Sequence, residues 1–240
     1  MTFALPAFCG LPCDEWPWPE PLPGAQWTTL RFDRRQLARD DIARCAIDVP
    51  APIRRAAPKR QAEFLAGRFC AREALHRLTG FDHVPAVAES KAPLWPEGLV
   101  GSITHSGDLA AVLVAPAHLY RGIGLDAETL IDTARAERLA GQILTPAERD
   151  WLATLPAERR GRFVTLAFSL KESLFKALFP LVGVRFYFQD AELTAWDNET
   201  QQATLQLLKP LSPDWPAASR LHGQYALLEG YLVSAVAIPV

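Results

Sequence analysis

The sequence predicts an α+β protein made of two similar lobes, each an antiparallel sheet packed with helices. Two observations support this class: a long helical pattern occurs twice along the chain, and each occurrence is followed by strand patterns joined through short turns. Strands joined by tight turns pair antiparallel, so each half would form its own sheet. We place the N-terminal lobe at residues 1–119 and the C-terminal lobe at residues 120–240.

The N-terminal half starts with a Pro- and Trp-rich stretch, residues 1–28, which predicts an extended, wrapped segment. Residues 57–80, APKRQAEFLAGRFCAREALHRLTG, predict a helix that ends at its last glycine. Residues 99–115 predict two strands joined by the turn Ser-Gly-Asp, and residues 120–126 predict a third strand beside this hairpin.

The C-terminal half contains LTPAERDWL, residues 144–152, in which Thr, Pro and Glu at capping-box spacing predict the start of a helix. A longer helix is predicted over about residues 158–179. Alternating segments at 184–193 and 202–208 predict strands separated by the turn Asp-Asn-Glu-Thr. Residues 223–239 then predict a strand, a Glu-Gly turn and a final strand.

The composition is that of an ordinary globular protein: 240 residues, 49% hydrophobic and 22% charged, with a formal net charge of −2. This balance argues against general nucleic-acid binding, and no apolar run reaches the roughly 18 residues that span a bilayer. The N-terminus lacks the basic start of a signal peptide. Four irregularly spaced cysteines predict neither a disulfide framework nor a zinc site, which favours a cytoplasmic protein.

Basic residues concentrate in residues 31–60, where nine Lys or Arg stand against four Asp. This excess is either a solvated face or a docking patch for an acidic partner. On the following helix, Arg60 and Arg68 share a face with apolar residues, so they either reach out to solvent or point into a cleft that holds anionic groups. His105, at a strand end, is either a structural histidine or a donor to a phosphate.

Two acids, Asp126 and Glu128, end the apolar run GIGLDAE. On a strand, residues i and i+2 point to the same side, with Cα atoms roughly 6.5–7 Å apart. Two carboxylates placed this way repel each other unless a cation lies between them, and hard oxygen ligands suit Mg²⁺. The alternative is a pair of surface acids at a strand end.

The helix AFSLKESLFKALF, residues 167–179, carries one narrow polar stripe in an otherwise apolar sequence. The stripe consists of Ser169, Glu172, Ser173 and Lys176. Either Glu172 and Lys176 form an ion pair within the helix, or Glu172 is a third carboxylate for the same metal with a lysine beside it.

Together, GSITHSG (101–107), GIGLDAE (122–128) and FSLKESLFKAL (168–178) resemble the three signature regions of Sfp-type 4′-phosphopantetheinyl transferases. KRQAEFLAGRFCAR (59–72) resembles the enterobactin synthase component D-like subgroup. The resemblance implies a monomer of two pseudo-symmetric lobes, with coenzyme A and Mg²⁺ in the cleft between them. The implied reaction moves 4′-phosphopantetheine from coenzyme A to a serine of an acyl or peptidyl carrier protein and releases 3′,5′-ADP.

The resemblance implies roles for four residues of the C-terminal half. Asp126, Glu128 and Glu172 match the metal-binding acids. Glu172, or a water that it orients, is also the candidate base. Lys176 matches the family lysine and would stabilise the departing 3′,5′-ADP.

Four basic residues of the N-terminal half match positions that bind coenzyme A. His105 matches a histidine that contacts its phosphates, and Lys91 matches the lysine of a GKP-like segment that reads SKAP here. Arg60 and Arg68 match basic positions near the adenosine 3′-phosphate.

Two other classes fit parts of the sequence. A Mg²⁺-dependent nuclease with an Asp…Glu-x-Lys core would need a lysine two residues after Glu128, where this chain has Leu130. A non-catalytic module that binds carrier proteins or coenzyme A would not need three acids around a metal. Assaying phosphopantetheine transfer and DNA cleavage separates these classes.

Overall fold

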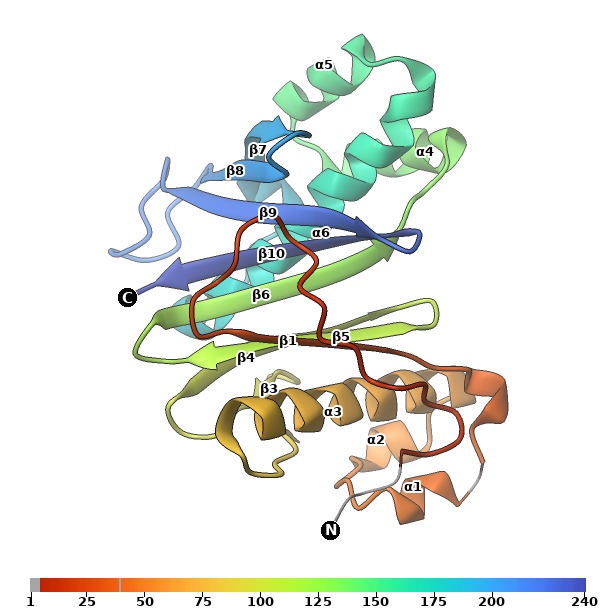
Figure 1. Ribbon diagram of the computed structural model, residues 1–240. Helices are drawn as coiled ribbons and strands as arrows, with labels where there is room; N and C mark the ends of the chain where they lie inside the picture. The colour runs from red at the N-terminus through yellow and green to blue at the C-terminus, as the bar shows by residue number, and fades with distance from the viewer. Residues whose placement is uncertain (1–4, 39) are drawn as a thin grey trace. The chain divides into compact units, whose positions relative to one another are not determined.

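The computed structural model describes residues 5–38 and 40–240 and shows helices packed against antiparallel sheets (Figure 1). The chain divides into two compact units. The first contains Pro23–Leu119 and the segment before Pro17, and the second contains Pro17–Leu22 and Tyr120–Val240. The predicted α+β class is confirmed, because each unit packs one long helix against its own antiparallel sheet.

The first unit is built on a three-stranded sheet with the order β1 (Gln26–Arg31), β5 (Leu109–Pro116), β4 (Leu99–Ser106). Helix α3 (Pro58–Thr79) packs against these strands and buries Leu65 and Phe69. The predicted helix and hairpin are both confirmed.

Gly80 ends α3 in the left-handed conformation, with φ of 78°, as a glycine stop requires. Short elements complete the first unit: η1 (Arg34–Gln36), α1 (Asp41–Arg44), α2 (Ala51–Arg54), β2 (Ala86–Val87) and β3 (Pro93–Leu94).

The second unit contains a five-stranded sheet, and long helix α6 (Ala157–Val182) packs on it against β6 and β10. Helix α4 (Thr133–Ile143) packs on α6, and α5 (Pro146–Thr154) begins with the predicted capping box at Thr145. The strand order is β6 (Tyr120–Thr129), β10 (Tyr231–Pro239), β9 (Arg220–Leu228), β8 (Gln202–Leu207), β7 (Ala191–Asp197).

A strap from the N-terminal stretch belongs to the second unit. Within Pro17–Leu22, the buried Trp18 indole donates a hydrogen bond to the carbonyl of Val233, 3.3 Å away. Earlier in the stretch, Cys9 and Cys13 form isolated bridges to the first unit's Phe32 and Thr29. Extended backbone is therefore confirmed at Cys9 and Cys13, whereas the chain bends at residues 18–20.

Glycines in β6 allow α6 to lie unusually close to the sheet. A Cβ at Gly124 would lie 1.7 Å from the carbonyl oxygen of Ser173, and one at Gly122 would lie 2.5 Å from that of Ala177. Both distances are far below contact, so only glycine fits. This close packing sets the distance between Asp126 on β6 and the side chains of α6.

Two predictions about strands need correction. Strand β6 continues to Thr129, so Asp126 and Glu128 lie inside the strand and do not end it. Residues 184–190 do not form a strand: β7 begins only at Ala191, after a loop and the short helix η2 (Phe188–Asp190).

The second correction has a physical reason. Strand β8 ends at Leu207, the partner of Ala191, so the preceding residues have no strand of this sheet to pair with. Phe186 and Phe188 pack instead against Phe175 and Phe168 of α6, with ring centroids 5.3 Å apart in both pairs.

The remaining strands agree with the sequence. The turn between β9 and β10 has left-handed φ angles at Glu229 and Gly230, as a tight hairpin requires. Residues 120–126 lie in a strand, β6, which pairs with β10 in the second unit; its expected place beside the β4–β5 hairpin stays a prediction. None of the helices in the described residues is both long and apolar enough to cross a bilayer.

Candidate functional site

An ion pair joins β6 to α6 at the centre of the predicted acidic site. The Lys176 ammonium donates to Asp126 Oδ1 at 2.7 Å and to the carbonyl of Leu125 at 2.9 Å. Asp126 is 4% exposed and Lys176 is partly exposed. The intrahelical alternative is therefore wrong, because the ion pair of Lys176 among the described residues is with Asp126 and not with Glu172.

Glu172 lies close enough to this pair to sense its charges. Burial raises the pKa of the Glu172 carboxyl above its ordinary value, Lys176 lowers it, and the negative charge of Asp126 raises it further. The net shift is upward. A carboxyl with a raised pKa in a partly buried site is a candidate general base, because its basicity lies nearer to neutral pH.

The two serines of the polar stripe serve the fold. Ser169 and Ser173 each place a hydroxyl within 2.9 Å of the Ser234 hydroxyl on β10, and Ser173 also donates to the Ser234 carbonyl at 3.0 Å. All three side chains are buried. The stripe thus contains two serines that bind α6 to β10, and two charged residues, Glu172 and Lys176, that are left as candidates for chemistry.

The donor chemistry here fits a hard cation, although a complete metal site is not preformed. Asp126 and Glu128 are two residues apart on β6, so their carboxylates leave the same face of the sheet. Lys176 already places one cation on Asp126. Nevertheless, no group of three or more His, Cys, Asp or Glu in the described part of the chain could hold a metal ion as it stands. The expected convergence of three acids is therefore not found.

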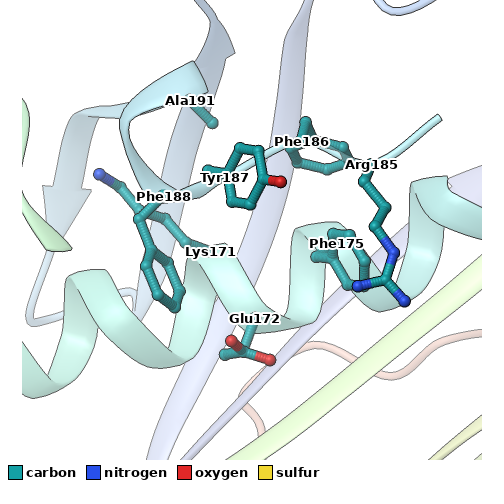
Figure 2. A pocket seen from close by; sticks show the side chains of 8 residues that line it. All are labelled: Lys171, Glu172, Phe175, Arg185, Phe186, Tyr187, Phe188 and Ala191. Atoms are coloured by element: carbon teal, nitrogen blue, oxygen red, sulfur yellow. The ribbon is translucent and has the colours of Figure 1, made fainter. Parts of the chain in front are cut away.

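A pocket of about 220 Å³ opens beside Glu172. Figure 2 shows residues 185–188 running alongside α6, from which Lys171, Glu172 and Phe175 project. The wall is mainly aromatic, and Tyr187 is largely exposed at it. Such a wall reduces the access of water to one side of Glu172, which agrees with the raised pKa of that carboxyl.

A second cluster, in the first unit, contains Arg60 and His105. Arg60 Nη1 lies 2.7 Å from His105 Nε2. Since a guanidinium only donates, Nε2 must accept, and the ring proton is then on Nδ1. That nitrogen lies 3.8 Å from a carboxylate oxygen of Glu63. Sequence reasoning missed Glu63, which also lies 3.6 Å from Arg60; its spacing of three residues from Arg60 on α3 was the available signal.

Arg68 is a buried cation that the structure leaves under-satisfied. Its side chain is 6% exposed, and its guanidinium lies 4.8 Å from the ring centroid of Phe64. Its Nε has no hydrogen-bond partner in the described residues, and Nη2 reaches the Ala86 carbonyl only at 3.5 Å. Burial, assisted by the charge of Arg60, lowers the pKa of Arg68 to about 10. An anion bound here would relieve both effects.

Lys91 is not brought to this cluster by any contact among the described residues. It lies on the exposed turn between β2 and β3, where its amide donates to the Ala88 carbonyl at 2.9 Å. Its φ of 72° is in the left-handed region, which is strained for a lysine. The altered segment SKAP thus holds Lys91 in a turn, with its side chain in solvent.

Family models match most of the chain. The model described as the 4′-phosphopantetheinyl transferase N-terminal domain matches residues 49–115. The model of the 4′-phosphopantetheinyl transferase superfamily matches residues 122–236. The second range contains Asp126, Glu128, Glu172 and Lys176, and the first contains Arg60, Arg68, Lys91 and His105.

Individual proteins give the same assignment. The chain is 39% identical over 217 residues to 4′-phosphopantetheinyl transferase Svp from Streptomyces mobaraensis, covering 88% of this chain and 86% of that protein. It is 37% identical over 149 residues to enterobactin synthase component D from Escherichia coli K12, covering 62% and 68%. A solved holo-[acyl-carrier-protein] synthase from Thermotoga maritima is 25% identical, with a TM-score of 0.36, and the match covers 50% of this chain and 62% of that one. A TM-score this low supports no assignment. The assignment rests on the family models and on the relatives.

Proposed function

The chain belongs to the 4′-phosphopantetheinyl transferase superfamily, and from this premise we propose that it converts apo-carrier proteins to their holo forms. It would transfer 4′-phosphopantetheine from coenzyme A to a carrier serine and release 3′,5′-ADP. The observation that carries the proposal is the Asp126–Lys176 pair beside Glu172, within the range matched by the superfamily model.

Glu172 is proposed to take the proton of the attacking serine. As the serine oxygen forms a bond to the β-phosphorus of coenzyme A, the bond from that phosphorus to the bridging oxygen breaks. The electron pair leaves with 3′,5′-ADP, and the serine proton passes to the Glu172 carboxylate. The raised pKa of Glu172 supports this role, because a stronger base accepts the proton more readily in the transition state.

Lys176 is proposed to stabilise the charge that develops on the departing phosphate. Its ammonium is already fixed by Asp126 and the Leu125 carbonyl, so little reorganisation is needed when that charge appears. Asp126 therefore positions Lys176 as well as offering a carboxylate oxygen. Mg²⁺ held by Asp126, Glu128 and Glu172 would neutralise pyrophosphate charge as a Lewis acid.

The cluster in the first unit is proposed to bind the phosphates of coenzyme A. Arg68 supports this most directly, since it is a buried cation with an unsatisfied Nε. Arg60 adds further guanidinium donors and lies close to both His105 and Glu63, and His105 is proposed to contact the phosphates from the same cluster. A bidentate arginine contact is the usual way to hold a phosphate. Lys91 is proposed to reach the same substrate from its exposed turn.

One experiment separates this function from its rivals. The protein is incubated with an apo-carrier protein, coenzyme A and Mg²⁺, and the carrier is weighed by mass spectrometry. A mass gain of one phosphopantetheine, together with release of 3′,5′-ADP, supports the transferase. An unchanged carrier mass with measurable coenzyme A binding would point to a binding module, and cleavage of plasmid DNA in a parallel reaction would point to a nuclease.

Three finer properties are also proposed: dependence on Mg²⁺, a monomeric state and a cytoplasmic location. The four cysteines are all free thiols, which suits a reducing compartment. Each unit has its own hydrophobic core, so neither needs a second copy to bury its apolar residues. Activity after EDTA treatment and the mass measured by light scattering test the first two properties.

A further inference from the structure

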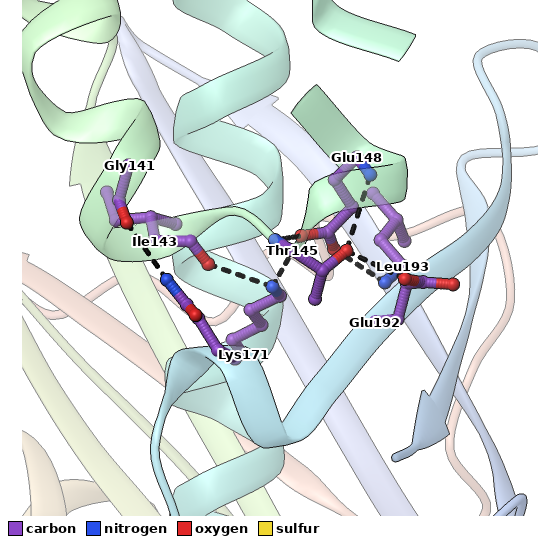
Figure 3. A network of polar contacts seen from close by, with 8 residues as sticks. Gly141, Ile143, Thr145, Glu148, Lys171, Glu192 and Leu193 are labelled. Carbon is purple, nitrogen blue, oxygen red and sulfur yellow. Dashed lines mark hydrogen bonds and ion pairs between the residues drawn. The ribbon is translucent and has the colours of Figure 1, made fainter. Parts of the chain in front are cut away.

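A buried ion pair next to Glu172 joins four segments of the second unit. The Lys171 ammonium donates to Glu148 Oε2 at 2.6 Å and to the Ile143 carbonyl at 2.9 Å. Both charged side chains are 1% exposed. The other oxygen, Glu148 Oε1, accepts from the Leu193 amide at 2.7 Å, and Oε2 also accepts from the Thr145 amide at 2.7 Å (Figure 3).

These contacts come from elements that are distant in sequence. Ile143 ends α4, Thr145 and Glu148 start α5, Leu193 lies on β7, and Lys171 projects from the middle of α6. We call Lys171, Glu148 and their three backbone partners the α6 clamp. A further bond, from the Thr145 hydroxyl to Glu192 at 2.7 Å, ties the clamp to β7 a second time.

We propose that Lys171 is a positioning residue that fixes the register and rotation of α6, and thereby the place of Glu172. Glu172 is the next residue, so any turn or slide of the helix that moves Lys171 moves Glu172 as well. The inference rests on the proposed function, because it concerns the base in that reaction.

The physical argument is that buried charges tolerate no other helix register. A slip of one residue moves a helical side chain by about 1.5 Å along the axis and about 100° around it. The slip would leave an ammonium and a carboxylate buried without partners, which is far costlier than rearranging apolar contacts. A buried ion pair is often no more stabilising than apolar residues of the same volume. The main effect of the ion pair at this position is therefore to select one arrangement of α6.

The role of Lys171 is mechanical and not electrostatic. The charges that shift the Glu172 pKa are those of Lys176 and Asp126. Removal of the clamp charges should therefore act on Glu172 through displacement. Displacement of a reacting group by about 1 Å can lower a rate by about 10²-fold.

The test removes both charges together in the full-length protein. The double variant Lys171→Met, Glu148→Gln avoids leaving one buried charge unpaired, and the Gln amide oxygen can still accept from a backbone amide. The control is Leu205→Ala on β8, a fully buried residue of the same core that takes no part in the clamp. Both variants should be less stable than wild type, and they are assayed at a temperature at which circular dichroism shows them folded.

Only the clamp variant should lose turnover. We expect its kcat to fall about 10- to 100-fold, with the Kd for coenzyme A within about threefold of wild type. Hydrogen exchange of backbone amides 169–176 should be faster than in the control. A kcat within about twofold of wild type, or an equal loss in Leu205→Ala, would overturn the inference. If wild type modifies no carrier, the proposed function fails. Hydrogen exchange then tests the clamp separately: equal exchange of amides 169–176 in the clamp variant and in Leu205→Ala would overturn the inference.

Discussion

Replacement of Gly124 by Ala should push α6 away from β6 and remove most of the turnover. The new Cβ would lie 1.7 Å from the Ser173 carbonyl oxygen and 2.7 Å from the Ala177 amide nitrogen. Ordinary contact begins at 3.4 Å, so the backbones must separate by about 1.7 Å. Both neighbouring atoms are backbone, which no side-chain rotation can relieve.

The expected magnitudes follow from this separation. Overpacking of a core costs about 1–3 kcal/mol of unfolding free energy, and a clash with two backbone atoms belongs at the upper end. Glu172 and Lys176 would move with α6 while Asp126 stays on β6, and a shift above about 1 Å can lower a rate by about 10²-fold. Urea unfolding measures the first effect, and single-turnover formation of holo-carrier measures the second.

Gly141 provides the matched control for this variant. It lies in α4, and a Cβ there would meet nothing within 4 Å. Gly141→Ala should therefore leave the rate unchanged and stabilise the protein by about 0.5–1 kcal/mol, because alanine loses less entropy in a helix. The argument from close packing is refuted if the unfolding free energy of Gly124→Ala lies within about 0.5 kcal/mol of the wild-type value and its turnover rate lies within twofold of wild type.

Four further predictions concern Asp126, Glu172 and the basic pair Arg54 and Arg55. Asp126→Asn should reduce transfer by at least about 10²-fold in a folded protein, because Lys176 loses its anionic partner. Circular dichroism checks the fold and a turnover assay checks the rate, and normal turnover would exclude Asp126 from the site. Glu172→Gln should lower kcat by about 10²–10⁴-fold if Glu172 is the base. Full rescue of the rate by high Mg²⁺ would instead show that Glu172 is only a metal ligand. Burial raises the pKa of Glu172, so the ionised carboxylate destabilises the fold at pH values above the raised pKa. Below the ordinary carboxyl pKa the group is protonated in both the folded and unfolded states, and this effect is absent. In EDTA, Glu172→Gln should therefore raise the Tm at neutral pH, with a difference that shrinks toward pH 4. Reversal of Arg54 and Arg55 to Glu should raise the carrier KM most at low salt, since exposed charges are screened over about 10 Å at 0.1 M; an equal KM at low salt would place docking elsewhere.

Much of the fold could be predicted from local patterns. The glycine stop of α3 and the capping box of α5 depend on a few neighbouring residues, and both are found as predicted. The hairpins β4–β5 and β9–β10 depend on short turn sequences. The strand predicted for 184–190 failed because an alternating aromatic pattern does not reveal whether a strand partner extends far enough to pair with it.

The sequence by itself determined which side chains share a face of one element. Spacing of two on β6 put Asp126 and Glu128 on one side, and spacing of four on α6 put Glu172 and Lys176 together. Such relations are local, because the geometry of a strand or helix sets them without regard to the rest of the chain.

Only the tertiary structure decided which partner each charge takes. Lys176 lies one helical turn from Glu172 on the same face of α6, yet it pairs with Asp126 because glycines let β6 approach α6 closely. Lys171 adjoins the site residue Glu172 in sequence, but its partner Glu148 lies 23 residues earlier, on another helix. A long side chain can reach several carboxylates, and the choice between them depends on packing between elements, which no local spacing contains.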